Sequence, residues 1–151
     1  MNRLLIFNLV FSCCFATSGL AEDVGRLKLA DLKSEGATQV MKAELDVLLP
    51  GAKVTNLTPA RSTRIWKNDA SGKFVVSTDL VGDTRGGRLG RTTTGNGTWH
   101  ISAEGAYCVQ IEWPQRTEQW CQYMFKLGDK YYGVRSLENP AGDAWAFSFS
   151  R

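Results

Sequence analysis

Residues 106–127 read AYCVQIEWPQRTEQWCQYMFKL, and this stretch decides the fold. Two runs rich in β-branched and aromatic residues flank a central Pro-Gln pair, a pattern typical of two antiparallel strands joined by a loop. Centring the loop between Pro114 and Gln115 places Cys108 directly opposite Cys121. We therefore predict a β-hairpin in which the two cysteines face each other.

The same register pairs Val109 with Trp120, and Ile111 with Glu118. A β-branched residue opposite an aromatic residue stabilises a ladder by roughly 0.2–1 kcal/mol. The apolar pair and the cysteine pair thus favour one and the same register.

Working outward, the chain after Gly51 consists of short β-type runs separated by Gly, Asn, Asp or Pro turns. About eight consecutive strands on short turns predict a single-domain, mainly β antiparallel meander. Closing it removes exposed strand edges, so we expect an up-and-down, lipocalin- or streptavidin-like barrel, with a strongly curved sheet as the alternative, and one helix packed across an end. The expected strands are Ala52–Thr58, Ser62–Lys67, Lys73–Leu80, Gly90–Thr94, Thr98–Ser102, Ala106–Trp113, Gln119–Leu127, Lys130–Leu137 and Ala144–Ser150.

Helical periodicity occurs once, before the strands. Met41, Leu45 and Leu48 share one face of a helix predicted over Thr38–Leu49. Thr38 can serve as its N-cap, and the Pro-Gly that follows Leu49 ends it. The preceding segment is less decided and includes a short extended piece at Leu27-Lys28-Leu29.

The N-terminus has the three parts of a cleavable export signal. A positive start is followed by an apolar run of about a dozen residues and by small side chains at Gly19 and Ala21. The run is too short for a membrane-spanning helix, which needs roughly 20 residues. We predict cleavage after Ala21, which leaves residues 22–151 as one domain without a transmembrane span. Lipidation at Cys13 is a less favoured alternative.

Cleavage removes one arginine and no acidic residue, so the net charge falls from +3 to +2. This near-balance argues against a nucleic-acid-binding protein. Cleavage also removes two cysteines, so only Cys108 and Cys121 remain in an oxidising compartment, where we predict that they form a disulfide. Two cysteines and the single His100 are too few for a structural zinc site, and no metal or cofactor is expected.

Several motifs are similar to those of a family of short, signal-bearing proteobacterial proteins of unknown function. They are the helix over residues 42–49, the strand Gly97-Thr98-Trp99, Tyr107-Cys108, and Trp120-Cys121. The resemblance covers roughly Lys42 to Tyr132 and implies an envelope or secreted protein with a β-rich fold. It provides no site residues, and the basic, glycine-rich segment from Gly82 to Arg91 departs from the family pattern.

That basic segment and the tryptophans provide the candidate ligand-binding residues. Arg85 and Arg88 are spaced by glycines, which let backbone N–H groups turn toward a common phosphate or carboxylate. Trp113, beside the proline at the hairpin tip, is the tryptophan expected to be exposed and free to stack on a sugar or anchor a partner. Trp99 and Trp120 are expected in the core.

No catalytic arrangement is expected. A triad would depend on His100, and nothing brings two carboxylates together. The leading hypothesis is a non-enzymatic periplasmic or secreted binding module for a glycan or an anionic lipid of the envelope. The alternative is a protein-interaction module, such as an inhibitor of an envelope or extracellular hydrolase, that inserts the loop from Trp113 to Glu118 into its partner.

Overall fold

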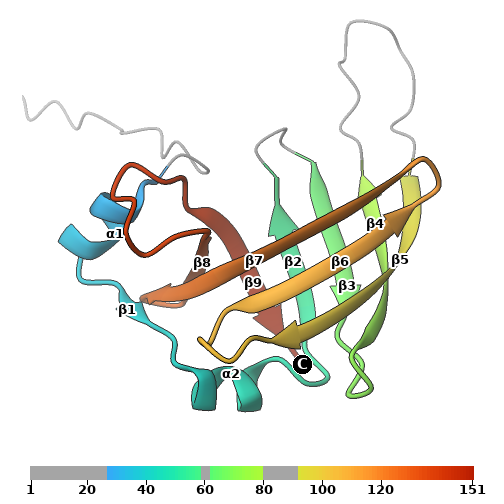
Figure 1. Ribbon diagram of the computed structural model, residues 1–151, viewed down its shortest axis with the longest axis horizontal. Coiled ribbons are helices and arrows are strands. Elements are labelled where there is room, and N and C mark those ends of the chain that lie inside the picture. Colours follow the sequence, from blue (N-terminus) through green and yellow to red (C-terminus); the bar gives the residue numbers. More distant parts are fainter. Residues whose placement is uncertain (1–26, 59–61, 80–91) are drawn as a thin grey trace, which may run out of the picture.

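The computed structural model describes residues 27–58, 62–79 and 92–151. Within these ranges eight antiparallel strands form a closed barrel (Figure 1), so the predicted fold is confirmed. The strands follow the order β7, β6, β5, β4, β3, β2, β9 and β8, and β8 pairs with β7 to close the sheet. Their bounds are β2 (Lys53–Leu57), β3 (Thr63–Lys67), β4 (Lys73–Asp79), β5 (Thr92–Ile101), β6 (Tyr107–Trp113), β7 (Arg116–Leu127), β8 (Lys130–Val134) and β9 (Trp145–Ser150).

The hairpin that decides the fold has the predicted register. In the β6–β7 ladder Cys108 lies opposite Cys121, Val109 opposite Trp120, and Ile111 opposite Glu118. Cys108 and Cys121 form the predicted disulfide. It lies on the outer surface of the barrel, because Trp120, next to Cys121, points into the core.

Two of the predicted strands are a single strand. Gly90–Thr94 and Thr98–Ser102 were expected on either side of a Gly-Asn-Gly turn, but β5 runs straight through it. The glycines provide close packing instead. A Cβ on Gly97 would lie 2.1 Å from the ring of Phe74, and a Cβ on Gly95 would lie 3.0 Å from the ring of Trp113.

The predicted helix starts later than expected. α2 covers Lys42–Leu48, because Thr38 and Gln39 form the short strand β1 (Thr38–Gln39), which pairs with β7. The helix start is satisfied by the carboxylate of Glu44, which accepts a hydrogen bond from the Met41 N–H at 2.8 Å.

A second helix, α1 (Leu29–Ser34), packs on the outside of the barrel. Leu29 and Leu32 are fully buried against Phe125 of β7 and Val134 of β8. The sequence indicated only a short extended piece here. A helix forms because leucines three positions apart both reach this outer apolar surface.

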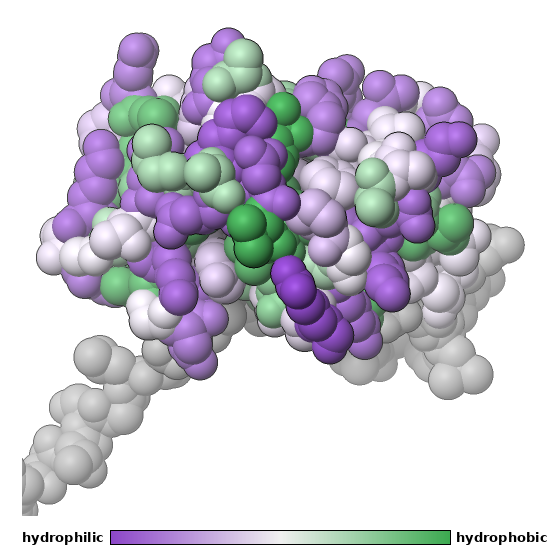
Figure 2. Space-filling model, turned by 90° about the horizontal axis from the view of Figure 1, so that it is seen from below, coloured by the Kyte–Doolittle hydropathy of each residue, from purple (hydrophilic) through white to green (hydrophobic). Residues whose placement is uncertain are grey.

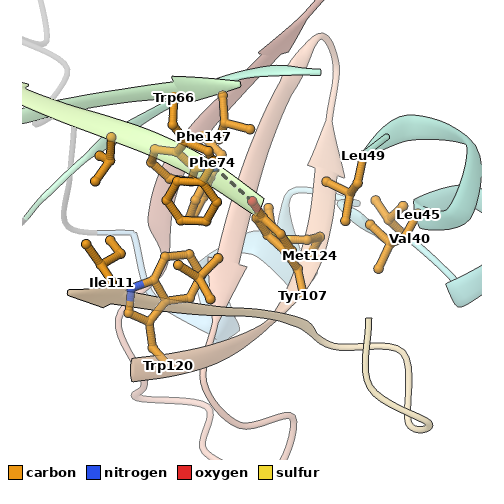
Figure 3. Packing of buried hydrophobic residues seen from close by; sticks show 13 residues of the cluster. Val40, Leu45, Leu49, Trp66, Phe74, Tyr107, Ile111, Trp120, Met124 and Phe147 are labelled. Carbon is orange, nitrogen blue, oxygen red and sulfur yellow. Dashed lines mark hydrogen bonds between the residues drawn. The ribbon is translucent and has the colours of Figure 1, made fainter. Parts of the chain in front are cut away.

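The main core fills the lumen and closes it at the α2 end. Figure 3 shows Leu45 and Leu49 on one side of the cluster and Trp66, Phe74 and Trp120 on the other, with Tyr107 and Met124 between them. A buried polar network fixes this arrangement. Asn68 Oδ1 accepts hydrogen bonds from the Tyr107 hydroxyl at 2.9 Å and from Trp66 Nε1 at 3.0 Å, and Asn68 Nδ2 donates to the Leu49 carbonyl at 3.2 Å.

The face seen from below, over α2, shows apolar side chains in separate groups between hydrophilic ones (Figure 2). The exposed apolar side chains of this helix region include Met41 and Val47. No helix in the described ranges is long and apolar enough to cross a membrane.

Candidate functional site

At the end of the barrel opposite α2, β2 leads to β3, β4 to β5 and β6 to β7 (Figure 1). A hollow of about 630 Å³ lies there, and we call it the mouth. It is lined by Ser62, Arg64, Thr78, Thr92, Thr93, Thr94, Trp113, Pro114, Gln115 and Arg116. This volume is typical of small-ligand sites.

An ion pair crosses the lumen at the base of the mouth. Arg64 projects from β3 and Glu118 from β7, and three strands separate β3 from β7 in either direction around the barrel. Arg64 Nη1 and Nη2 donate to the two carboxylate oxygens of Glu118 at 2.6 and 3.0 Å. The two side chains are only 10% and 23% exposed. This bidentate geometry fixes the guanidinium between opposite walls.

Further groups surround the Glu118 carboxylate. Trp113 Nε1 donates a hydrogen bond to it at 3.3 Å, and Arg116 Nη2 lies 3.9 Å away. Burial raises the pKa of Glu118, but the hydrogen bonds and charge of Arg64, aided by Trp113 and Arg116, outweigh this and lower it below the ordinary value of 4.5. Glu118 is therefore ionised at neutral pH and serves as the counter-ion of Arg64.

The Arg64 guanidinium also lies over the ring of Trp113, 5.5 Å from its centroid. Its Nε has no hydrogen-bond partner among the described residues. Arg64 thus keeps unused hydrogen-bonding capacity at Nε although its charge is already compensated by Glu118.

Hydroxyl groups form the wall of the mouth that β3, β4 and β5 provide. Thr78 of β4 lies directly opposite Thr93 of β5, and Ser62, just before β3, is hydrogen-bonded through its hydroxyl to Thr58 at 2.6 Å. Thr94 also borders the hollow, but its side chain alternates with that of Thr93 and faces the outer side of the barrel. Hydroxyls both donate and accept hydrogen bonds, so the wall suits a ligand that does the same.

Below the ion pair, three further inward-facing residues carry buried polar atoms that have no partner among the described residues. They are Asn56 Oδ1, Trp120 Nε1 and both amide atoms of Gln122. Ordered water usually satisfies such atoms in folded proteins. The deeper lumen is therefore filled by side chains that are not all apolar.

The structure places the predicted site residues differently. Trp113 lines the mouth but is half-buried rather than exposed. Arg85 and Arg88 lie outside the described residues. Trp120 is buried as expected, whereas Trp99 is only half-buried.

Sequence reasoning missed Arg64 and Glu118, although both left a trace. Arg64 is two residues before Trp66 in one strand, so the two side chains share the inner face. Glu118 is the register partner of the buried Ile111, which places it inside as well. The signal for the site was a charged residue at an inward-facing position near the end of each of two strands.

The hairpin tip offers little projecting surface. Trp113 and Arg116 are already register partners, so only Pro114 and Gln115 form the turn. Glu118 points into the barrel and binds Arg64. An inserted inhibitory loop from Trp113 to Glu118 would have to leave these positions.

His100 lies on the outer wall, exposed and opposite Cys108 in the β5–β6 ladder. It is on the opposite side of the sheet from the lumen. In the part of the chain that the structure describes, no three His, Cys, Asp or Glu side chains come together as a metal site.

A second hollow, of about 540 Å³, lies against the outer side of β3 to β6. Its charged side chains balance, with Lys67 and Lys73 against Asp69 and Glu112, and all four are exposed. The mouth differs because it contains a buried charge, so we take the mouth as the candidate site.

The fold and the site define a small, disulfide-linked antiparallel β-barrel with a polar, arginine-bearing mouth. The chain matches the family described as "Protein of unknown function (DUF995)" over residues 27–124, and it belongs to this family. No curated protein and no solved structure matches the chain.

Proposed function

We propose that the protein is a non-enzymatic binding module of the periplasm or the extracellular space, and that it holds a small anionic ligand in the mouth of its barrel. The ligand's source is a component of the envelope, either a glycan or the headgroup of an anionic lipid. The observation that carries the proposal is the charge of the mouth.

The described residues that line the mouth include two arginines and no acidic residue. Glu118 lies behind them and compensates one of the two positive charges. Among the described residues, one positive charge is therefore left over where the mouth meets solvent. An anion in this hollow would replace solvent as the partner of a guanidinium, an interaction about twice as strong as a neutral hydrogen bond.

Two observations support the proposed compartment, namely the disulfide and the predicted export signal. Disulfides persist in oxidising compartments and are rare in the cytosol. The Cys108–Cys121 pair, in a chain whose first 21 residues have a signal-peptide pattern, supports export.

The non-enzymatic assignment rests on where the reactive groups lie. His100 is on the outer wall, away from the mouth. Glu118 is held by two hydrogen bonds from Arg64, and its lowered pKa makes it a poor proton donor at neutral pH. The mouth is therefore better suited to holding an anion than to transferring a proton.

The test is a binding screen on the purified protein and two variants. Acetate, inorganic phosphate, D-glucose and phosphatidylglycerol vesicles are compared with chloride at equal ionic strength, and the unfolding temperature is recorded. Arg116→Gln removes a charge of the mouth, and Lys73→Gln removes one from the outer hollow.

We expect an anionic probe to raise the unfolding temperature, because a ligand that binds only the folded state stabilises it by about 2.7 kcal/mol at 100 times its Kd. Arg116→Gln should weaken this effect and Lys73→Gln should not. An equal loss in both variants, or no response to any anion, contradicts the proposal. A response only to protein-containing envelope extract would favour the protein-interaction alternative.

A further inference from the structure

We infer that the ligand of the mouth is an acidic sugar, a hydroxylated ring that carries one carboxylate. This inference rests on the proposed function and specifies the chemical class of its ligand. Three properties of the mouth lead to it: its volume, its hydroxyl wall, and the way the lumen below it is filled.

The volume excludes a simple inorganic anion as the full occupant. A hollow of about 630 Å³ falls within the range of sites that enclose an organic molecule. A carboxylate or phosphate on Arg116 would fill only a fraction of it. The ligand must therefore extend along the wall beyond the arginines.

The lining determines what that extension is made of. Thr78 and Thr93 turn their hydroxyls toward the hollow from neighbouring strands, and the two apolar lining residues are Trp113 and Pro114 at the β6–β7 turn. An alkyl chain along the hydroxyl wall would take polar groups out of water without giving them a hydrogen bond, which is unfavourable. A ring that carries several hydroxyls satisfies them, while its C–H face can lie against the apolar surface of the turn.

The filled lumen excludes the apolar ligands that a wide barrel would take. The pair of Arg64 and Glu118 crosses the lumen below the mouth. Beneath it the core is occupied by aromatic rings, among them Trp66, Phe74 and Trp120 (Figure 3). A fatty chain cannot pass this level without breaking a buried ion pair, so the ligand is confined to the polar mouth.

These features combine into one arrangement. The ligand carboxylate faces the positive side of the mouth, where Arg64 and Arg116 flank Glu118. The ring hydroxyls face the wall of Thr78 and Thr93. A neutral sugar lacks the first contact, and a simple carboxylate lacks the second.

The experiment measures the Kd of D-glucuronate, D-glucose and acetate by isothermal titration calorimetry. D-Glucuronate should bind at least about tenfold more tightly than either of the other two, since each lacks one set of contacts worth about 1.4 kcal/mol or more. Thr93→Val, which removes a hydroxyl and keeps the shape, should weaken D-glucuronate about fivefold and leave acetate unchanged.

Acetate binding as tightly as D-glucuronate, with no effect of Thr93→Val, would overturn the acidic sugar while leaving an anion-binding mouth in place. D-Glucose binding as tightly as D-glucuronate would overturn the need for the carboxylate. Failure of all three in a protein whose mouth responds to phosphate or to lipid vesicles would also overturn this inference alone. Failure of every anion would overturn the proposed function with it.

Discussion

Replacing Glu118 by glutamine removes the counter-ion of Arg64 and keeps the size of the side chain. Arg64 is 90% buried and its two Nη atoms donate to Glu118, so the variant leaves a buried guanidinium without a compensating charge. Breaking a buried ion pair in this way costs about 3–5 kcal/mol. Because Glu118 is 23% exposed, we expect the lower end of this range, about 3 kcal/mol.

The assay is urea unfolding followed by tryptophan fluorescence, from which the free energy of unfolding is obtained by linear extrapolation. Asp46→Asn is the matched control, since it breaks the exposed helical pair of Lys42 and Asp46 and should cost at most about 0.5 kcal/mol. In a double variant, Arg64→Met with Glu118→Leu, both charges are gone. Its stability should recover most of the loss, because an apolar pair of similar size is often neutral or better.

A cost below about 1 kcal/mol for Glu118→Gln, no larger than that of Asp46→Asn, would refute the view that this pair is a buried structural element of the mouth. A double variant less stable than Glu118→Gln would refute the explanation by an uncompensated charge.

The remaining predictions concern pH, the disulfide and the glycines. The lowered pKa of Glu118 means that its stabilising contribution is present above pH 4.5 and is lost as the pH falls through its lower folded-state pKa, so wild type should lose more stability between pH 5 and pH 3 than Glu118→Gln in parallel urea titrations. Equal losses would contradict this. Relative to the oxidised wild type, Cys108→Ser with Cys121→Ser should lower the free energy of unfolding by about 3 kcal/mol, as expected for a loop of this size. Wild type in reducing buffer should match the double variant, and a reduced wild type as stable as the oxidised one would contradict this. Gly97→Ala should destabilise by about 1–3 kcal/mol or more, because its Cβ would meet the Phe74 ring at 2.1 Å; an unchanged free energy of unfolding in the same urea titration would contradict this steric explanation.

The sequence was most informative where local chemistry and pairing agree. The Pro-Gln turn, the facing cysteines and the pair of Val109 with Trp120 all require one register, and the structure has it. Propensity was misleading at Gly95-Asn96-Gly97, which reads as a turn. Tertiary packing determines the structure of this segment, because the rings of Phe74 and Trp113 occupy the space that a Cβ would need.

The site was harder to predict than the fold. Arg64 and Glu118 are 54 positions apart in sequence and meet only because the sheet closes. The sequence predicted a barrel but did not fix how many strands separate β3 from β7 in each direction. It therefore could not show that these two strands face each other. Trp113 was identified for its position at the turn, but its contacts with Arg64 and Glu118 depend on that same closure.

The most direct test of an anion held in the mouth is a titration with D-glucuronate followed by ¹H–¹⁵N spectra of the arginine Nε groups. We expect the Nε resonances of Arg64 and Arg116 to shift in a saturable manner. The resonance of Arg151, whose guanidinium binds the Val47 carbonyl at the opposite end of the barrel, should stay in place. Shifts confined to other arginines, or backbone shifts centred on Lys73 and the outer hollow instead, would contradict a binding site in the mouth.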